Sequence, residues 1–219
     1  MKKYELTAEF IEKWGKKLFR IKALISFGSV EAGELGGYIE KEDNLAHDGN
    51  AWVYGDAEVY GNARVSGNAR VYGNARVSGD AEVSGNAWVY GNAEVSGNAW
   101  VYGNAEVSGD ARVYGNARVS GDARVSGNAW VYGNADYLLI GRIGSRFSFT
   151  TFFKNKDKGI TVSCGCFLGT IAEFRAKVTD THGNNKHAKI YNLAADMAEL
   201  QILGEEHFDK LNTNKSESF

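Results

Sequence analysis

The chain has 219 residues, with 25 basic and 27 acidic side chains and a formal charge of −2 at pH 7. A charge this close to balance argues against a general nucleic-acid binder, and a hydrophobic content of 43% argues against a disordered chain. The sequence holds 27 glycines and no proline, although average usage predicts about 11 prolines in a chain of this length. The fold therefore has no place for a residue that lacks a backbone N–H group.

Residues 1–48 read as an N-terminal capping segment. Thr7 to Lys13 predicts a short helix with Thr7 as N-cap, and Leu18 to Phe27 predicts a strand. The charged start has no apolar run behind it, so we expect no signal peptide. No stretch of the chain approaches the ~18 apolar residues of a membrane-spanning helix, so we expect no membrane association.

The middle of the chain repeats the unit Gly-(Asn/Asp)-Ala-x-Val-(Tyr/Ser). Glycine stands at every sixth position from Gly49 to Gly133, and valine at every sixth position from Val53 to Val131. Within Ala-x-Val the alternation is that of a short strand, with Ala and Val on one side and x on the other. Gly followed by Asn or Asp supplies a corner. Short strands joined by repeated corners predict a solenoid.

One hexad on each of three sides predicts a triangular coil of about 18 residues. The charges on the outward x positions support this period. Residues one coil apart would stack at about 4.8 Å, and at an offset of 18 no two like charges meet. An offset of 6 would place Arg64 against Arg70, and an offset of 12 would place Glu82 against Glu94. We therefore predict a parallel β-helix over residues 49–143, in which the outward pairs are complementary.

Residues 144–219 predict a small α+β domain. Phe147 to Phe153 and Ile160 to Phe167 read as the two strands of a hairpin. The sequence from Thr170 to Glu173 is a capping box that opens a helix to about Thr181. A second helix runs from about Asn185 to Leu203, and its end is followed by a frayed terminus at Asn212 to Phe219. One face of the second helix is apolar: Ile190, Leu193, Met197 and Leu200.

Several of these segments resemble known sequences. A hydrophobic residue with a small one two places before it, repeated every six, resembles the hexapeptide repeat of left-handed parallel β-helices. The segments Gly33–Ile39, Asn44–Leu45 and Ala51–Val53 resemble the start of bacterial and prophage β-solenoid proteins labelled as acyltransferases or polymer-forming proteins. Val162–Phe167 with Thr181–Asn184 is similar to their C-terminal region. The resemblance implies a left-handed β-helix, but no established activity and no catalytic residues.

The resemblance also implies a role. We expect a non-catalytic interaction protein of phage or prophage type in the cytoplasm of a bacterial host, acting on a host protein or a signalling nucleotide, for example to inhibit host defence. Two alternatives stay open, namely an acyltransferase for a small molecule and a self-assembling structural protein. Acyl transfer of this kind uses a histidine base, and all four histidines lie outside the perfect repeats: His47, His182, His187 and His207. We assign no catalytic residue and expect no cofactor.

Two cysteines and two histidines of the C-terminal domain form a candidate zinc set: Cys164, Cys166, His182 and His187. The His-x4-His spacing suits zinc, but Cys-x-Cys is tighter than the common Cys-x2-Cys. The alternative is a pair of core cysteines beneath the two helices, and we expect no metal.

Five basic residues form a candidate contact for a phosphate or nucleotide: Arg142, Arg146, Lys154, Lys156 and Lys158. The alternative is a solvated hairpin turn whose lysines protect the edge of a sheet.

The first face of the predicted coils gathers large aromatic residues and arginine over three coils: Trp52, Tyr54, Arg70, Tyr72, Trp88 and Tyr90. Trp, Tyr and Arg are the residues enriched at interface hot spots, so we predict a binding surface here. The alternative is that outward aromatics only stabilise the stacked strands. The expected partner is another protein or a second copy of the chain, which would make a homo-oligomer.

Overall fold

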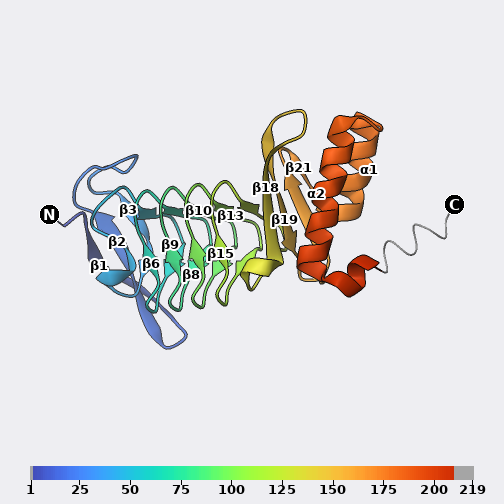
Figure 1. Ribbon diagram of the computed structural model, residues 1–219. Coiled ribbons are helices and arrows are strands. Elements are labelled where there is room, and N and C mark those ends of the chain that lie inside the picture. Colours follow the sequence, from blue (N-terminus) through green and yellow to red (C-terminus); the bar gives the residue numbers. More distant parts are fainter. Residues whose placement is uncertain (1, 210–219) are drawn as a thin grey trace. The chain divides into compact units, whose positions relative to one another are not determined.

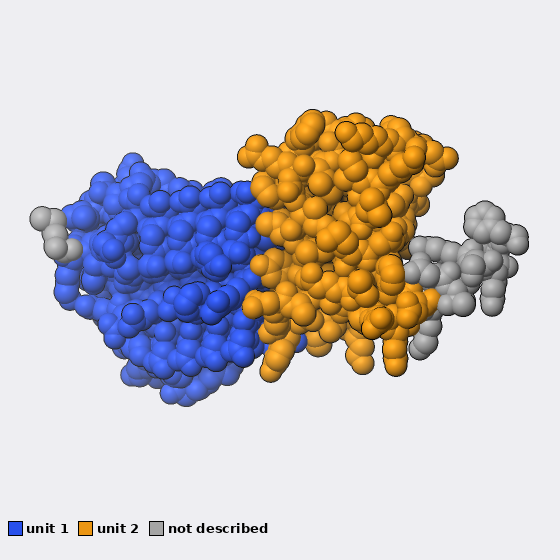
Figure 2. Space-filling model, viewed as in Figure 1, with its two compact units in different colours: residues 1–128 blue, residues 129–219 orange. Residues whose placement is uncertain are grey.

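The computed structural model describes residues 2–209, and the predicted frayed terminus at 212–219 lies outside this range. The chain divides into two compact units, residues 1–128 and residues 129–219, drawn in blue and orange in Figure 2. The first holds the N-terminal cap and the stacked coils, and the second a four-stranded sheet with two helices (Figure 1). The segment limits expected from sequence, 1–48, 49–143 and 144–219, stay a prediction.

The coils of the first unit consist of two-residue strands, one in each repeat of six. Their bounds are β4 (Trp52–Val53), β5 (Glu58–Val59), β6 (Arg64–Val65), β7 (Arg70–Val71), β8 (Arg76–Val77), β9 (Glu82–Val83), β10 (Trp88–Val89), β11 (Glu94–Val95), β12 (Trp100–Val101), β13 (Glu106–Val107), β14 (Arg112–Val113), β15 (Arg118–Val119) and β16 (Arg124–Val125). Every third strand joins the same parallel sheet, so that β4-β7-β10-β13-β16, β5-β8-β11-β14 and β6-β9-β12-β15 form three separate faces.

The register between coils is the predicted one. Trp88 lies opposite Arg70 and Glu106, which stand three hexads before and three hexads after it. Backbone N–H groups of the Asn/Asp, x and Tyr/Ser positions donate to the following coil, as Trp52 N does to the carbonyl of Ala69 at 3.1 Å. Proline at these positions would remove a donor. The β-solenoid of about five coils is thereby confirmed, while its left-handed sense stays a prediction.

The interior of the coils holds only alanine and valine, and their side chains are fully buried. Glycine at the corners is required for two reasons that Gly79 illustrates. Its φ is +69°, and a Cβ placed on it would lie 2.9 Å from the backbone nitrogen of Gly97 in the next coil. Asparagine beside these glycines forms ladders along the corners, where Asn68 Nδ2 donates to Asn86 Oδ1 at 3.0 Å.

The N-terminal cap is a hairpin that continues one face of the coils. It contains β1 (Tyr4–Lys13), β2 (Lys16–Ala23), β3 (Leu35–Ile39) and the 3-10 helix η1 (Glu42–Asn44). β1 and β2 pair antiparallel, β2 pairs antiparallel with β3, and β3 pairs parallel with β5. The predicted helix over Thr7–Lys13 is therefore wrong, because pairing with β2 supplies the backbone hydrogen bonds that a helix would have made. The strand expected over Leu18–Phe27 is present as β2, displaced toward the N-terminus.

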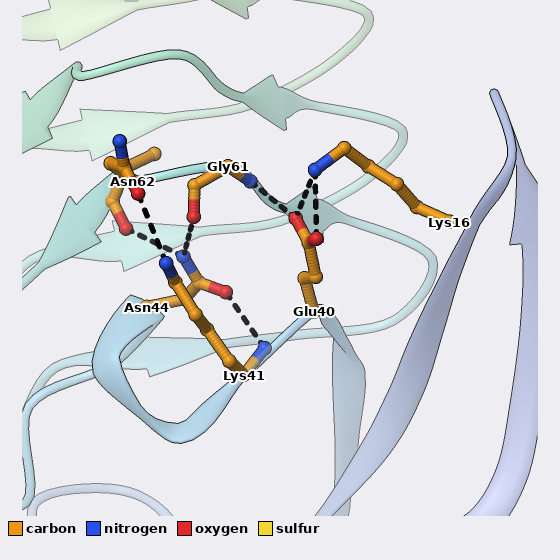
Figure 3. Close-up of polar contacts among 7 residues, drawn as sticks. Lys16, Glu40, Lys41, Asn44, Gly61 and Asn62 are labelled. Carbon is orange, nitrogen blue, oxygen red and sulfur yellow. Dashed lines mark hydrogen bonds and ion pairs between the residues drawn. The ribbon is translucent and has the colours of Figure 1, made fainter.

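Polar side chains fix the cap to the first complete coils (Figure 3). Asn44 is fully buried and its Nδ2 donates to the carbonyls of Gly61 at 3.1 Å and Ala63 at 2.8 Å. Glu40 Oε2 accepts from Gly61 N at 2.6 Å, and Lys16 Nζ donates to both oxygens of the same carboxylate. The first coil therefore has partners for backbone groups that would otherwise be exposed at the end of the solenoid.

The second unit begins with a last short strand and continues as an antiparallel sheet with two helices. Its elements are β17 (Trp130–Val131), the 3-10 helix η2 (Asn134–Asp136), β18 (Tyr137–Ile143), β19 (Ser148–Lys154), β20 (Ile160–Cys164), β21 (Phe167–Thr170), α1 (Ile171–His182) and α2 (Lys186–Leu203). The sheet order is β18-β19-β20-β21. The predicted hairpin and both predicted helices are confirmed. Residues 137–143, which the repeat-based prediction included in the β-helix, form the first strand of this sheet.

Both helices begin as the sequence predicts. Thr170 Oγ1 accepts from Glu173 N at 3.3 Å, and Glu173 Oε2 accepts from Thr170 N at 2.8 Å, which completes the capping box of α1. Asn185 caps α2 through its side chain. The buried face of α2 consists mainly of small residues: Ala188, Tyr191, Ala194, Ala195, Ala198 and Ile202. The apolar face identified from sequence points away from this core, with Leu193, Met197 and Leu200 all exposed.

Candidate functional site

The predicted binding surface of the coils is present as a cluster of contacting side chains, which we call the aromatic surface: Tyr54, Arg70, Tyr72, Trp88 and Tyr90. The rings of Tyr72 and Tyr90 are parallel, with centroids 4.8 Å apart. The Trp88 ring meets Tyr72 edge-on at 6.3 Å, and the guanidinium carbon of Arg70 lies 5.6 Å from the Trp88 centroid. These contacts join neighbouring coils, so they depend on the register of three hexads per coil.

A hollow of about 300 Å³ lies within the aromatic surface. Its walls are Ser29, Tyr54, Arg70, Tyr72 and Trp88. Ser29, which sequence reasoning did not select, comes from the cap and shares a hydrogen bond of 3.3 Å with the Tyr54 hydroxyl. Burial raises the pKa of Tyr72, as do the neighbouring Tyr90 and Glu106, so the hydroxyl stays protonated at neutral pH.

Trp52 does not belong to this surface, which corrects the sequence-based assignment. Its side chain is 0% exposed, because the Phe27 ring covers it edge-on at 5.4 Å and the Tyr4 ring at 6.1 Å. Its Nε1 is buried and finds no hydrogen-bond partner in residues 2–209. The spacing of the repeats could not show that the cap folds over the first coil, and Trp52 is a core residue of that junction.

The other faces of the coils carry aromatic residues in different surroundings. Trp100 is 41% exposed and contacts Arg118, whose guanidinium carbon lies 4.9 Å from its ring. Trp14, at the tip of the β1–β2 hairpin, stacks on Tyr60 with ring centroids 5.0 Å apart. Sequence reasoning missed Trp14, although a Trp-Gly pair between two β-prone runs is a signal for a hairpin turn.

The five basic residues expected to form a phosphate contact are not brought together. Lys154 Nζ pairs with Asp136 at 3.2 Å, and Arg142 lies over the Phe149 ring at 5.9 Å. Lys156 and Lys158 are exposed in the turn between β19 and β20, at the end of β19 away from Arg146. Arg146 lines a separate cavity of about 500 Å³ in the second unit.

The cysteines line that same cavity. Cys164 ends β20 and its Sγ accepts from Thr150 Oγ1 at 3.3 Å, while Cys166 is exposed in the turn to β21. His182 also lines the cavity, and its ring lies 5.8 Å from that of His187. In residues 2–209 no group of three or more His, Cys, Asp or Glu side chains is placed to hold a metal ion.

The remaining histidines are His47 and His207, and His47 lines a hollow of about 380 Å³ together with Arg64, Ser66 and Glu82 on one face of the coils. His47 stacks on Tyr4 at 4.4 Å within the cap junction, and His207 follows α2. No loop interrupts the coils from β4 to β16. None of the helices within residues 2–209 has the length and apolar character needed to cross a membrane.

Comparison with known families supports the solenoid. The family described as the YdcK beta solenoid repeat matches residues 57–71, 69–85, 105–121, 111–127 and 117–133. All five segments belong to the repeated hexads, so the chain is similar to that family in its coils. No curated protein matches the chain.

Proposed function

We propose that the chain is a binding protein without catalytic activity, and that its aromatic surface docks another protein. The observation that supports this most is the cluster of Arg70, Tyr72, Trp88 and Tyr90, which is contiguous, solvent-accessible and hollowed. Rigid aromatic side chains beside arginine dominate the free energy of many protein interfaces. The coils hold these side chains in place through backbone pairing, so little conformational entropy is lost on docking.

The chemistry of the surface favours a partner with one apolar and one acidic side chain. The hollow between Tyr54, Tyr72 and Trp88 would take an apolar group, whose burial there excludes water from three rings. Arg70 at its edge would meet the acidic group, and its stacking on Trp88 limits its freedom before docking. The expectation that the partner is a host protein, and the chain of phage type, rests on the sequence resemblance.

Trp88→Ser tests this proposal against a matched control, Trp100→Ser. The two tryptophans occupy the same repeat position on different faces, contact an arginine each, and are 39% and 41% exposed. Trp88→Ser should weaken association by about 2 kcal/mol, or roughly 30-fold in Kd, as expected for a hot-spot truncation. Trp100→Ser should leave it unchanged.

The measurement is sedimentation velocity of each variant, first by itself and then with a partner that has been captured by pull-down with the wild-type protein. If Trp88→Ser loses self-association while Trp100→Ser keeps it, the partner is a second copy of the chain. Equal behaviour of both variants and the wild type would show that these aromatics serve only the stacking of strands. The thermal unfolding of both variants should match, because neither side chain is buried.

A further inference from the structure

The cavity in the second unit is open to solvent and is lined by the sheet, the turns that follow β18 and β20, and both helices. We call it the thiol cavity, and its volume is about 500 Å³, within the ~300–1,000 Å³ typical of small-molecule sites. Its lining residues are Ser145, Arg146, Ser148, Cys164, Gly165, Cys166, Phe167, Phe174, Lys177, Val178, Thr181, His182 and Tyr191. All of them belong to residues 129–219, so the cavity is complete within one unit.

The charged groups that line the thiol cavity are cationic. Arg146 and Lys177 contribute to the walls, and no carboxylate does. Lys177 pairs with Asp180 at 3.0 Å, but both side chains are more than 60% exposed, so the pair neutralises it only weakly. In the part of the chain that the structure describes, Arg146 forms no ion pair. Its Nη1 lies over the cysteine turn, 3.8 Å from where a Cβ on Gly165 would stand.

Aromatic side chains line another part of the thiol cavity. The ring of Phe174 lies between those of Phe167 at 5.7 Å and Tyr191 at 5.6 Å, and the ring of His182 stacks on Tyr191. Burial raises the pKa of Tyr191 to about 12, assisted by the neighbouring Cys164. The hydroxyl therefore remains a neutral donor at physiological pH, next to the thiol and the arginine.

We propose that the thiol cavity binds a small organic anion with a flat aromatic body. Arg146 would bind the anionic group in a bidentate manner, with hydroxyls of Ser145 and Ser148 at the same side of the cavity. The body of the ligand would lie against Phe167, whose ring is partly exposed and packs on the buried Phe174. Ring stacking and the loss of hydrated apolar surface both favour it there. This site is independent of the aromatic surface on the coils.

The two cysteines allow a direct test, because they are the only thiols in the chain and both line the cavity. Phenyl phosphate and benzoate are the probes, since they share an aromatic body and differ in the anionic group. Alkylation by iodoacetamide, followed by mass spectrometry of the intact chain, reports the accessibility of the thiols. A ligand at about ten times its Kd should slow alkylation about tenfold, since only the empty fraction reacts. Titration calorimetry measures the Kd independently.

Two arginine variants separate a specific site from general charge. Arg146→Gln should weaken binding of the protective probe by about tenfold or more, because a charge-assisted pair of hydrogen bonds is lost. Arg142→Gln is the matched control, since Arg142 is an exposed arginine four residues away that does not line the cavity. It should bind like the wild type.

Protection by either probe, lost in Arg146→Gln and kept in Arg142→Gln, would support the proposal and identify the anionic group. Protection by neither probe at millimolar concentration would overturn it. Inorganic phosphate that protects as well as phenyl phosphate would refute the aromatic part of the recognition. Equal binding by wild type and Arg146→Gln would refute the assignment of the anion to this arginine.

Discussion

Reversing the charge of Glu94 is the sharpest test of how the coils are held in register. Glu94 lies between Arg76 and Arg112, one coil before and one coil after it. Its carboxylate oxygens are 3.3 Å from Arg76 Nη1 and 3.5 Å from Arg112 Nε. Glu94→Arg would replace two attractive contacts by a stack of three arginines, so we expect the free energy of unfolding to fall.

The size of the effect follows from the exposure of these side chains. All three are one-third to one-half exposed, so each lost ion pair contributes about 0.5 kcal/mol and each new like-charge contact costs a similar amount. The four changes together give about 2 kcal/mol. High salt should reduce this loss, because partly exposed charges are screened.

Glu106→Arg is the control, because Glu106 has similar exposure but only one arginine neighbour in its sheet. Its carboxylate contacts Arg124 at 3.6 Å, and on the other side Glu106 faces Trp88. An arginine at position 106 would repel Arg124 but would make a favourable cation–π contact with Trp88. We expect a loss of about 0.5 kcal/mol here. Urea unfolding with a common m-value, and hydrogen exchange of the coil around Val95, measure both variants. Equal losses for the two substitutions would refute the argument from stacking at three hexads per coil.

Three further predictions concern single positions. Gly79→Ala should destabilise the coils more than Gly55→Ala, as chemical denaturation would show, because both have positive φ but only the Cβ at position 79 meets the next coil. Burial lowers the pKa of Lys3 to about 8, and the nearby Asp48 offsets this lowering in part. The Lys3 ammonium group therefore loses its proton at a lower pH in the folded chain than in the unfolded chain. The free energy of unfolding should therefore rise between pH 8 and pH 9.5, and Lys3→Met should remove this rise. Arg175→Met should cost about 3 kcal/mol in thermal or chemical unfolding, because it leaves the buried Glu199 carboxylate without the guanidinium that binds it at 2.7 Å; a loss below about 1 kcal/mol would contradict this.

The register of the coils could be predicted because the repeat fills the interior of every coil alike, so that the charges at the outward x positions distinguish one offset from another. Complementary stacking at one offset was enough to exclude the others. The helices of the second unit were predictable for a local reason, since Thr170 and Asn185 carry their capping signals close to the first turn. These features depend on short-range sequence or on a strict period.

What the sequence could not show depends on how separate segments cover one another. Trp52 occupies the same repeat position as Trp88, yet only Trp52 lies beneath the cap, and nothing in the hexads distinguishes them. Thr7–Lys13 contains acceptable helix formers, and only its pairing with β2 makes it a strand. In α2 the alanines approach the sheet closely, so the larger Leu193 and Met197 remain outside.

The asparagine ladders have a direction, and this restricts how such an array can lengthen. An amide both donates and accepts, whereas a carboxylate only accepts, so Asn62 donates to Asp80 at 3.0 Å and the row ends there. A new row begins at Asn98, which donates to Asn116 at 3.2 Å. A duplicated coil with asparagine at its corners could therefore be inserted at any level without loss of a bond. A coil with aspartate would divide the row wherever it was placed, because a carboxylate has no hydrogen to donate to the next coil.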